Sequence, residues 1–342
     1  MSELTLSEII LNARPESKPS SVKAYERILN KFINMPDNLG GVEWVENYEE
    51  IEKFIGDLKL AKTTERNYYV ALMIYVEGIN GGKFTDKWQT LPEYETYKNK
   101  VDFLNNEYKK AKEEKGATEK QLDNMVPRED ILKALEGLIP EIRKIRSGLD
   151  WSSGGGAVNK ESSRTFMCYV LAMIYMEMPV RNEIANLKVI GQRDYNKLIK
   201  NATEPIRDNF LIVRKDVSVI ARHKYKTSDQ YGSVETPLPK SLRPLINAWI
   251  KYRNVLEGED KYLFPDLQPM PGSKSSTAEL NLTKTLQRFF KKLIGKEIST
   301  TILAKIKFQS LVDKKSLDNL KEASAIRGTS LGTAGLVYAN GE

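Results

Sequence analysis

Residues 209–239, NFLIVRKDVSVIARHKYKTSDQYGSVETPLP, are predicted to place a small β-sheet inside an otherwise helical chain. The runs 209–213 and 217–223 are short and rich in β-branched residues, a composition that favours strands. Residues 225–239 are predicted to form a strand, a turn at 230–232 and a returning strand. We therefore expect a small antiparallel sheet in the second half of the chain.

The sequence on both sides of this segment has helical patterns. After Ser20 and Ser21, which are typical N-cap residues, apolar residues recur at three- and four-residue spacing up to Phe32. Further helices are predicted at about 48–60, 63–80, 161–178, 241–256, 276–293, 300–312 and 315–325. The expected fold class is mainly α with one small antiparallel β-sheet.

The composition changes in the middle of the first half, which divides the predicted helices into two domains. Residues 94–120 are rich in Lys and Glu and end near Gly116, as an exposed helix followed by a joint does. We expect a helical domain at 1–107, a linker at 108–124 and a second domain at 125–342.

The charge and the rare residue types narrow the function. The chain has 342 residues and a net charge of +7, a surplus that favours polyanionic partners such as nucleic acid. Cys168 is the only cysteine and His223 the only histidine, so thiolate zinc sites and multi-histidine metal sites are excluded. Without a long apolar run or a secretory signal pattern, we expect an intracellular protein with no membrane contact.

Three local sequences place candidate catalytic residues in a characteristic order. MEMPVRNEIANL, at 176–187, contains Arg181 directly after a predicted buried helix. The sheet segment contains Lys226, and RGTSLGTAGLVYAN, at 327–340, contains Tyr338. This order, in which an Arg is followed by a Lys on a β-hairpin and then by a C-terminal Tyr, resembles that of the tyrosine recombinases (integrases) and the related type IB topoisomerases. The Arg-Asn-acidic step and the Lys-Thr-Ser turn are most similar to recombinases of eukaryotic DNA viruses and mobile elements.

The resemblance implies a fold and a reaction. The first domain looks like a SAM-like core-binding domain, and the two domains would form a C-shaped clamp on double-stranded DNA. Arg181 would stabilise charge on a phosphodiester, Lys226 would protonate the leaving 5′-oxygen, and Tyr338 would form a 3′-phosphotyrosine link. Site-specific recombination through a Holliday junction by a homo-tetramer, with no cofactor or metal, would follow in the nucleus or cytoplasm of a host.

The chain departs from the family pattern at three positions. Thr301 and Thr329 stand where many members have His, Lys or Trp, and a hydroxyl can still hydrogen-bond a phosphate. Ala304 stands where the second arginine is expected, and Lys305 follows it. Because a lost phosphate-stabilising group typically costs about 10²–10³ in rate, we expect this chain to bind DNA and to cleave it poorly. Ala304 is either a natural impairment or a replaced arginine, and the otherwise preserved motif favours replacement.

Basic and polar residues elsewhere are candidates for DNA contacts. The set at the start of a helix is Lys62, Arg66 and Asn67, and the set beside the catalytic motifs is Arg222, His223, Lys224 and Lys305. A solvated helix end is the alternative for the first set, and His223 is interpreted as either a DNA contact or a structural residue. Only Ala339–Glu342 follow Tyr338, which suggests either truncation or assembly through other contacts.

Two other functions fit the same motifs. A monomeric type IB topoisomerase shares the chemistry and relaxes supercoils, and a DNA-binding regulator without catalysis would explain Ala304. A telomere resolvase is less consistent with the modest length of the chain.

Overall fold

The computed structural model describes residues 4–35, 42–115, 119–147, 160–257, 261–273, 277–312 and 317–329. The chain divides into two compact units, Met1–Glu114 and Lys115–Glu342. This boundary lies within the segment 108–124 that we expected to be a linker. The first residues of that segment instead continue helix α5 (Pro92–Lys115), so 108–114 belong to unit 1.

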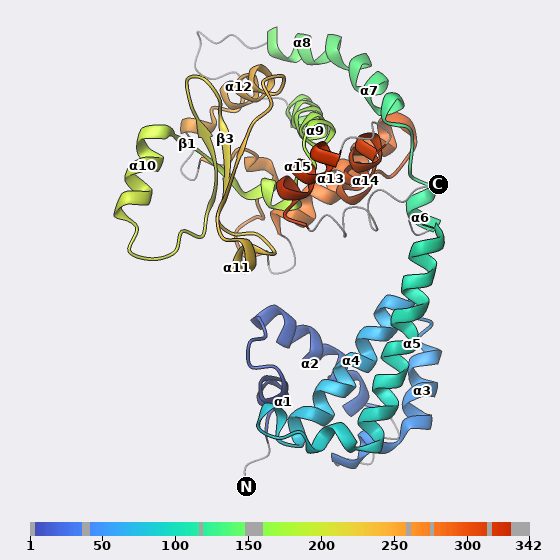
Figure 1. The fold of residues 1–342 in the computed structure, drawn as a ribbon. Coiled ribbons are helices and arrows are strands. Elements are labelled where there is room, and N and C mark those ends of the chain that lie inside the picture. Colours follow the sequence, from blue (N-terminus) through green and yellow to red (C-terminus); the bar gives the residue numbers. More distant parts are fainter. Residues whose placement is uncertain are drawn as a thin grey trace. The chain divides into compact units, whose positions relative to one another are not determined.

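Unit 1 is helical throughout its described part (Figure 1). Its elements are α1 (Leu6–Ala13), α2 (Pro19–Ile33), α3 (Tyr48–Asp57), α4 (Lys62–Ile79) and α5, with 3-10 turns at Val42–Glu46, Gly82–Phe84 and Lys87–Thr90. The ring of Phe32, on α2, lies 5.4 Å from that of Phe54 and 5.8 Å from that of Tyr68. Because these apolar side chains come from three helices, their burial joins the unit into one core.

Two glycines allow α1 to pack closely against the end of α4 and the 3-10 turn that follows it. A Cβ on Gly78 would lie 2.1 Å from the carbonyl oxygen of Ile9, and one on Gly82 would lie 2.2 Å from that of Asn12. No other residue type fits such a close backbone approach. The contact also buries the carboxylate of Glu77, which forms an ion pair with Arg14.

Unit 2 contains more helices and a sheet. Its described helices are α6 (Glu119–Leu122), α7 (Arg128–Gly137), α8 (Ile139–Ser147), α9 (Lys160–Glu177), α10 (Gln192–Asn201), α11 (Ser228–Tyr231), α12 (Arg243–Tyr252), α13 (Ala278–Ile294), α14 (Thr300–Val312) and α15 (Leu317–Arg327). The strands are β1 (Leu187–Gly191), β2 (Asn209–Val213), β3 (Val219–Arg222) and β4 (Val234–Pro237), and 3-10 turns lie at Asn182–Asn186, Val255–Glu257 and Pro265–Leu267.

Helix α9 is the centre of unit 2 and packs against α8, α12, α13 and α14 (Figure 1). Eleven of its eighteen residues are buried, so it is apolar on nearly every side. On α12, the indole of Trp249 contacts the ring of Phe166 edge-on at 5.4 Å and donates a hydrogen bond of 2.7 Å to the carbonyl of Leu263. The end of this rigid helix positions the residues that follow it.

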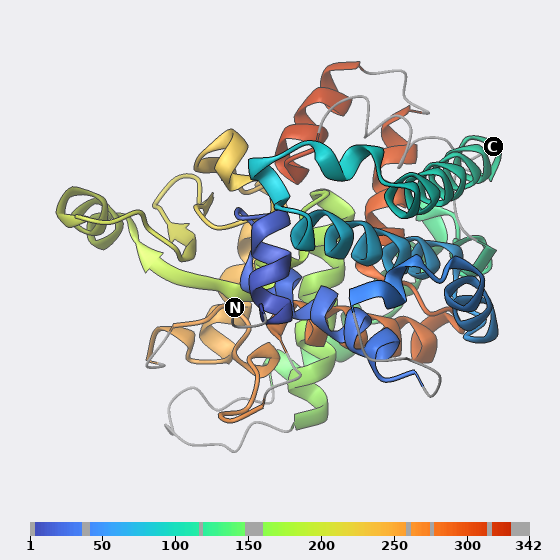
Figure 2. The ribbon, with the colours of Figure 1, turned by 90° about the horizontal axis from the view of Figure 1, so that it is seen from below.

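The sheet has the order β1-β2-β3-β4 and separates two apolar clusters. Phe210 and Ile212 face Tyr195 of α10, whereas Leu211 faces the core around α9, as the alternation of side chains along a strand requires. Figures 1 and 2 both show α10 on the outer side of the sheet, away from α13.

The expected fold class, mainly helical with one small sheet, is confirmed, with a correction to the sheet. The pairs β2–β3 and β3–β4 are antiparallel, but β1 lies parallel to β2, so the sheet is mixed. The connection from β3 to β4 is also longer than the predicted turn at 230–232, because it contains the short helix α11.

Candidate functional site

Arg181 follows α9 and occupies the cap position of the 3-10 turn Asn182–Asn186. The turn is fixed by Asn182, which accepts a hydrogen bond of 3.1 Å from the hydroxyl of Tyr175 and donates one of 2.9 Å to Thr283. The guanidinium of Arg181 donates through Nη2 to the carbonyl of Gly328 at 2.8 Å. Its Nη1 is buried and has no hydrogen-bond partner among the described residues.

The carbonyl of Gly328 also accepts a hydrogen bond of 3.2 Å from the hydroxyl of Thr227. Gly328 ends α15 with a φ of +65°, which favours glycine. A Cβ at this position would lie 3.2 Å from the ring of Tyr225 and 3.3 Å from Oγ1 of Thr227. One backbone carbonyl therefore joins the segments that contain Arg181, Lys226 and the approach to Tyr338.

Arg222 and Glu183 form a buried charge pair beside this carbonyl. Nη1 of Arg222 lies 3.7 Å from Oε1 of Glu183, and its Nη2 donates to the carbonyl of Ala325 at 3.4 Å. The guanidinium also lies over the ring of Tyr225, 5.2 Å from its centroid. Burial lowers the pKa of Arg222 and raises the pKa of Glu183.

A third arginine completes the charge arrangement. Arg327 is buried and donates through Nη1 to the carbonyl of Val180 at 2.8 Å. The positive charges of Arg222, Arg181 and Arg327 all oppose the effect of burial on the pKa of Glu183. We call Arg181, Glu183, Arg222, Thr227, Gly328 and Arg327 the Gly328 cluster. In this cluster the single carboxylate of Glu183 partly neutralises three guanidinium groups. Each surface ion pair among the described residues instead joins one cation to one carboxylate.

Lys226 lies in the connection between β3 and α11 and is exposed. Its neighbours hold the backbone, since Tyr225 donates from its hydroxyl to the carbonyl of Gly232 at 2.8 Å and Thr227 donates to Gly328. An ammonium group on a fixed backbone, open to solvent, is accessible to a substrate phosphate.

The predicted positions on α14 are less exposed. Ala304 is completely buried and Thr301 is half-buried. Lys305 is only 6% exposed and donates to the side chain of Gln121 at 2.9 Å, so it is a buried group rather than the DNA contact that we expected. Helix α14 packs against α9 and α15, so it lies beside elements of the Gly328 cluster.

The third departure and the proposed nucleophile lie at the C-terminal end. Thr329 is half-buried, and its backbone N–H donates to the carbonyl of Ser324 at 2.9 Å, which continues the cap of α15. Tyr338 lies outside the described residues. Five of the six predicted catalytic positions therefore lie within the described residues: Arg181, Lys226, Thr301, Ala304 and Thr329.

The predicted DNA contacts at the end of β3 divide into exposed and buried residues. Arg222 is 1% exposed, which corrects its assignment as a surface contact. His223 contacts Ser233 through Nδ1 at 2.8 Å and Tyr195 through Nε2 at 3.2 Å, which favours the structural alternative for this residue. Lys224 is exposed, as a phosphate contact requires.

In unit 1, the three predicted contacts lie in the first turns of α4. Lys62 forms an ion pair of 3.2 Å with Glu107, and Arg66 donates to Asn105 at 3.2 Å. Both partners lie on α5, so these cations have neighbours within the unit, and Asn67 is exposed. The ion pair is exposed and contributes little to stability, which leaves Lys62 available to a stronger anion.

Glu183, Thr227, Gly328 and Arg327 were not predicted as site residues. The local signal was present for two of them, because Arg327 and Gly328 directly precede Thr329 in the motif 327–340. Glu183 is two residues after Arg181, but its pairing with Arg222 joins positions far apart in the sequence. Within the described ranges, no group of three His, Cys, Asp or Glu side chains is placed to hold a metal ion.

None of the described helices is both long enough and apolar enough to span a membrane.

Neither a protein-family model nor a curated protein sequence matches the chain.

Two solved structures are similar to the chain over nearly its whole length. The crystal structure of XerA recombinase has 12% sequence identity and a TM-score of 0.37, and covers 97% of this chain and 92% of its own. The Tn1549 transposon integrase, in complex with transposon right end DNA, has 13% identity and a TM-score of 0.48, and covers 99% of this chain and 96% of its own. In structure, the chain is similar to a recombinase and to a transposon integrase.

Proposed function

We propose that this chain is a DNA strand-transfer enzyme of the tyrosine recombinase (integrase) class. The observation that supports it best is the carbonyl of Gly328, which accepts hydrogen bonds from Arg181 and from Thr227, the neighbour of Lys226. Gly328 also begins the segment that leads to Tyr338. The order of motifs in the sequence and this junction of distant segments support the same reaction.

In the proposed reaction, the phenolate oxygen of Tyr338 attacks the phosphorus of a DNA phosphodiester. The bond from phosphorus to the 5′-oxygen breaks, and Lys226 donates a proton to that oxygen. A 3′-phosphotyrosine ester forms and keeps the energy of the broken bond, so a 5′-hydroxyl can later reverse the step on the same or another strand. Arg181 stabilises the charge that develops on the non-bridging oxygens.

In this proposal, the alanine at position 304 makes the chain a weak catalyst. A methyl group cannot hydrogen-bond a phosphate, and Ala304 is completely buried on α14. The other two arginines of the Gly328 cluster are engaged, since Arg327 donates to Val180 and Arg222 is buried against Glu183. We infer that neither group replaces the missing arginine without rearrangement.

The finer features of the proposal follow from the resemblance of the sequence. They are site-specific recombination through a Holliday junction, a homo-tetramer on paired DNA sites, and an origin in a virus or mobile element. The location would be that of the target DNA, in the nucleus or cytoplasm of a host.

Restoring arginine at position 304 tests the proposed activity. The probe is a pool of nicked duplexes with a randomised core, enriched for retention by the chain. Ala304→Arg should raise the amount of covalent protein–DNA adduct by about 10²–10³, whereas Ala304→Gln, the polar and uncharged control, should not. Adding Tyr338→Phe to Ala304→Arg should abolish the adduct. Equal adduct levels in the Ala304→Arg and Ala304→Gln variants would show that the assignment of Ala304 is wrong.

One observation favours a second function. The alanine at position 304 is consistent with a DNA-binding regulator that has lost catalysis. Such a protein would retain duplexes with a preferred sequence, and no substitution at position 304 would produce an adduct.

A further inference from the structure

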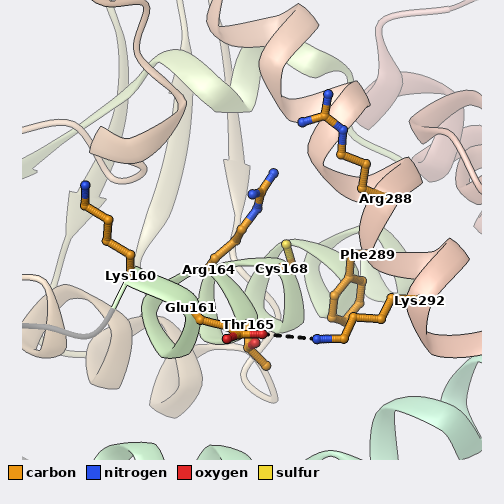
Figure 3. Close-up of a pocket in the computed structure, with 8 residues that line it drawn as sticks. All are labelled: Lys160, Glu161, Arg164, Thr165, Cys168, Arg288, Phe289 and Lys292. Carbon is orange, nitrogen blue, oxygen red and sulfur yellow. Dashed lines mark hydrogen bonds and ion pairs between the residues drawn. The ribbon is translucent and has the colours of Figure 1, made fainter.

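A second group of cations surrounds a cavity at the other end of α9. The cavity has a volume of about 450 Å³ and lies between the first half of α9 and the second half of α13 (Figure 3). Its lining includes Lys160, Arg164 and Cys168 of α9, and Arg288 and Lys292 of α13. Along α9, Arg164 is roughly 20 Å from the end of the helix at a rise of 1.5 Å per residue, so this cavity is separate from the Gly328 cluster.

The charges that line the cavity are unbalanced. Four cationic side chains face one carboxylate, that of Glu161, and Glu161 already accepts a hydrogen bond of 3.2 Å from Lys292. Within the ranges that the structure describes, neither Arg164 nor Arg288 makes a hydrogen bond or an ion pair. Since like charges held around one space repel each other, an anion in this space would be favourable.

The side chains are oriented for one ligand. Figure 3 shows the guanidinium groups of Arg164 and Arg288 extending to the same side of α9, with the sulfur of Cys168 between their stems. Lys160 extends to that side as well, whereas the pair of Lys292 and Glu161 lies on the other. Two guanidinium groups from two rigid helices present planar pairs of N–H donors, which fit the oxygens of a phosphate group.

The start of α9 adds to this field. Lys160 is the first residue of this helix of 18 residues, where backbone N–H groups have no partner inside the helix and the helix dipole is positive. The wall of the cavity is completed by the ring of Phe289 and by the buried thiol of Cys168. Burial raises the pKa of that thiol to about 12, so the thiol contributes no negative charge that would oppose an anion.

We propose that the cavity between α9 and α13 is a binding site for a phosphate group, held chiefly by Arg164 and Arg288. The phosphate belongs either to the backbone of nucleic acid or to a free phosphate compound. The site does not depend on strand transfer, because it uses none of the residues of the Gly328 cluster.

The test compares the full chain with two double variants. Arg164→Gln/Arg288→Gln removes the two guanidinium groups of the cavity. Arg193→Gln/Arg207→Gln, the matched control, removes the same charge from exposed positions outside it. All four arginines are exposed, so both variants should fold, and their melting temperatures verify this.

Calorimetric titration with sodium pyrophosphate tests the free source. A loss of about tenfold or more in affinity in the cavity variant alone would support the proposal, with a free phosphate compound as the ligand. Arg164→Lys/Arg288→Lys, which keeps the charge and loses the planar fork, should bind with intermediate affinity.

Titration with a duplex of arbitrary sequence at several salt concentrations tests the polymeric source. If the cavity holds backbone phosphate, the slope of log K against log salt should decrease by about 1–2 in the cavity variant and less in the control. Equal behaviour of the two double variants with both probes would overturn the proposal. An Ala304→Arg chain that forms no DNA adduct but passes either test would contradict strand transfer and leave this site standing.

Discussion

The two ends of α9 carry groups of arginines that are neutralised in different ways. In the Gly328 cluster, the guanidinium groups are wholly or partly buried, surround the carboxylate of Glu183 and donate to backbone carbonyls. At the cavity between α9 and α13, Arg164 and Arg288 are exposed, and the one carboxylate there is engaged by Lys292.

This difference shows how the surroundings of an arginine indicate its role. A buried guanidinium requires partners inside the protein, because leaving it unpaired costs several kcal/mol, so the Gly328 cluster fixes the positions of its segments. Exposed guanidinium groups are stabilised by water and can remain unpaired until an anion arrives. The first group is therefore expected to govern stability and catalysis, and the second to govern binding alone.

Removing Arg181 should have the largest effect. In a chain that carries Ala304→Arg, Arg181→Ala should lower the rate of adduct formation at saturating protein by about 10²–10³, because it removes a phosphate-stabilising group. Arg193→Ala in the same background removes an exposed arginine that belongs to neither group and should leave this rate unchanged. A similar loss in both variants would contradict the role of Arg181.

Removing Arg222 should affect stability more than any exposed arginine does. Arg222→Met leaves the carboxylate of Glu183 buried and without its closest cation, so the free energy of unfolding should fall by about 3 kcal/mol. Urea unfolding measures this, and Arg288→Met should change the value by less than about 0.5 kcal/mol. Arg222→Met/Glu183→Gln should recover part of the loss, and a double variant no more stable than Arg222→Met would argue against the pair.

Glycine at position 328 should be required by the Gly328 cluster. With its φ of +65° and a ring 3.2 Å from an added Cβ, Gly328→Ala should cost about 1–2 kcal/mol or more in the free energy of unfolding. Gly56→Ala is the control, since a Cβ at this position of α3 meets nothing within 4 Å and alanine stabilises a helix. Equal effects of the same sign would show that the α15 end does not constrain the cluster.

The smallest expected effect concerns His223 and the pH. Burial lowers the pKa of His223 below its usual 6.5, so the unfolded chain binds the proton more tightly than the folded one. Stability is then fully present above about pH 6.5 and falls as the pH drops through the lowered pKa. His223→Asn should remove this part of the acid-induced loss in melting temperature. At pH 8 or so it should leave duplex affinity unchanged, whereas a large loss of affinity would identify His223 as a DNA contact.

Much of the helical framework could be predicted from local sequence. The predicted bounds of β2 and α14 agree with the structure, because both are short, apolar runs between clear breaks. The strand β1 and helix α10 were missed, since LKVIG is a strand only through its parallel pairing with β2, a contact that no local pattern encodes. Tertiary pairing decides such short segments.

The candidate site could be predicted only in part, because contacts between distant segments are not visible in the local sequence. Arg181 and Lys226 are in motifs whose order is visible in the sequence. The burial of Arg222 is not visible there, because the sequence shows it beside His223 and Lys224 in a basic run. Only the packing of β3 beneath the end of α15 converts this residue from a surface cation to the partner of Glu183.

The central claim is that Tyr338 forms a covalent bond with DNA. The most direct test is mass spectrometry of the peptide that contains Tyr338, after the Ala304→Arg chain has reacted with the nicked duplexes and been treated with nuclease. We predict that this peptide carries a nucleotide joined to Tyr338 through its 3′-phosphate, and that adding Arg181→Ala lowers its yield by about 10²–10³ at early reaction times. An adduct on another residue, or none while the chain still retains the duplexes, would contradict the assignment of Tyr338 as the nucleophile.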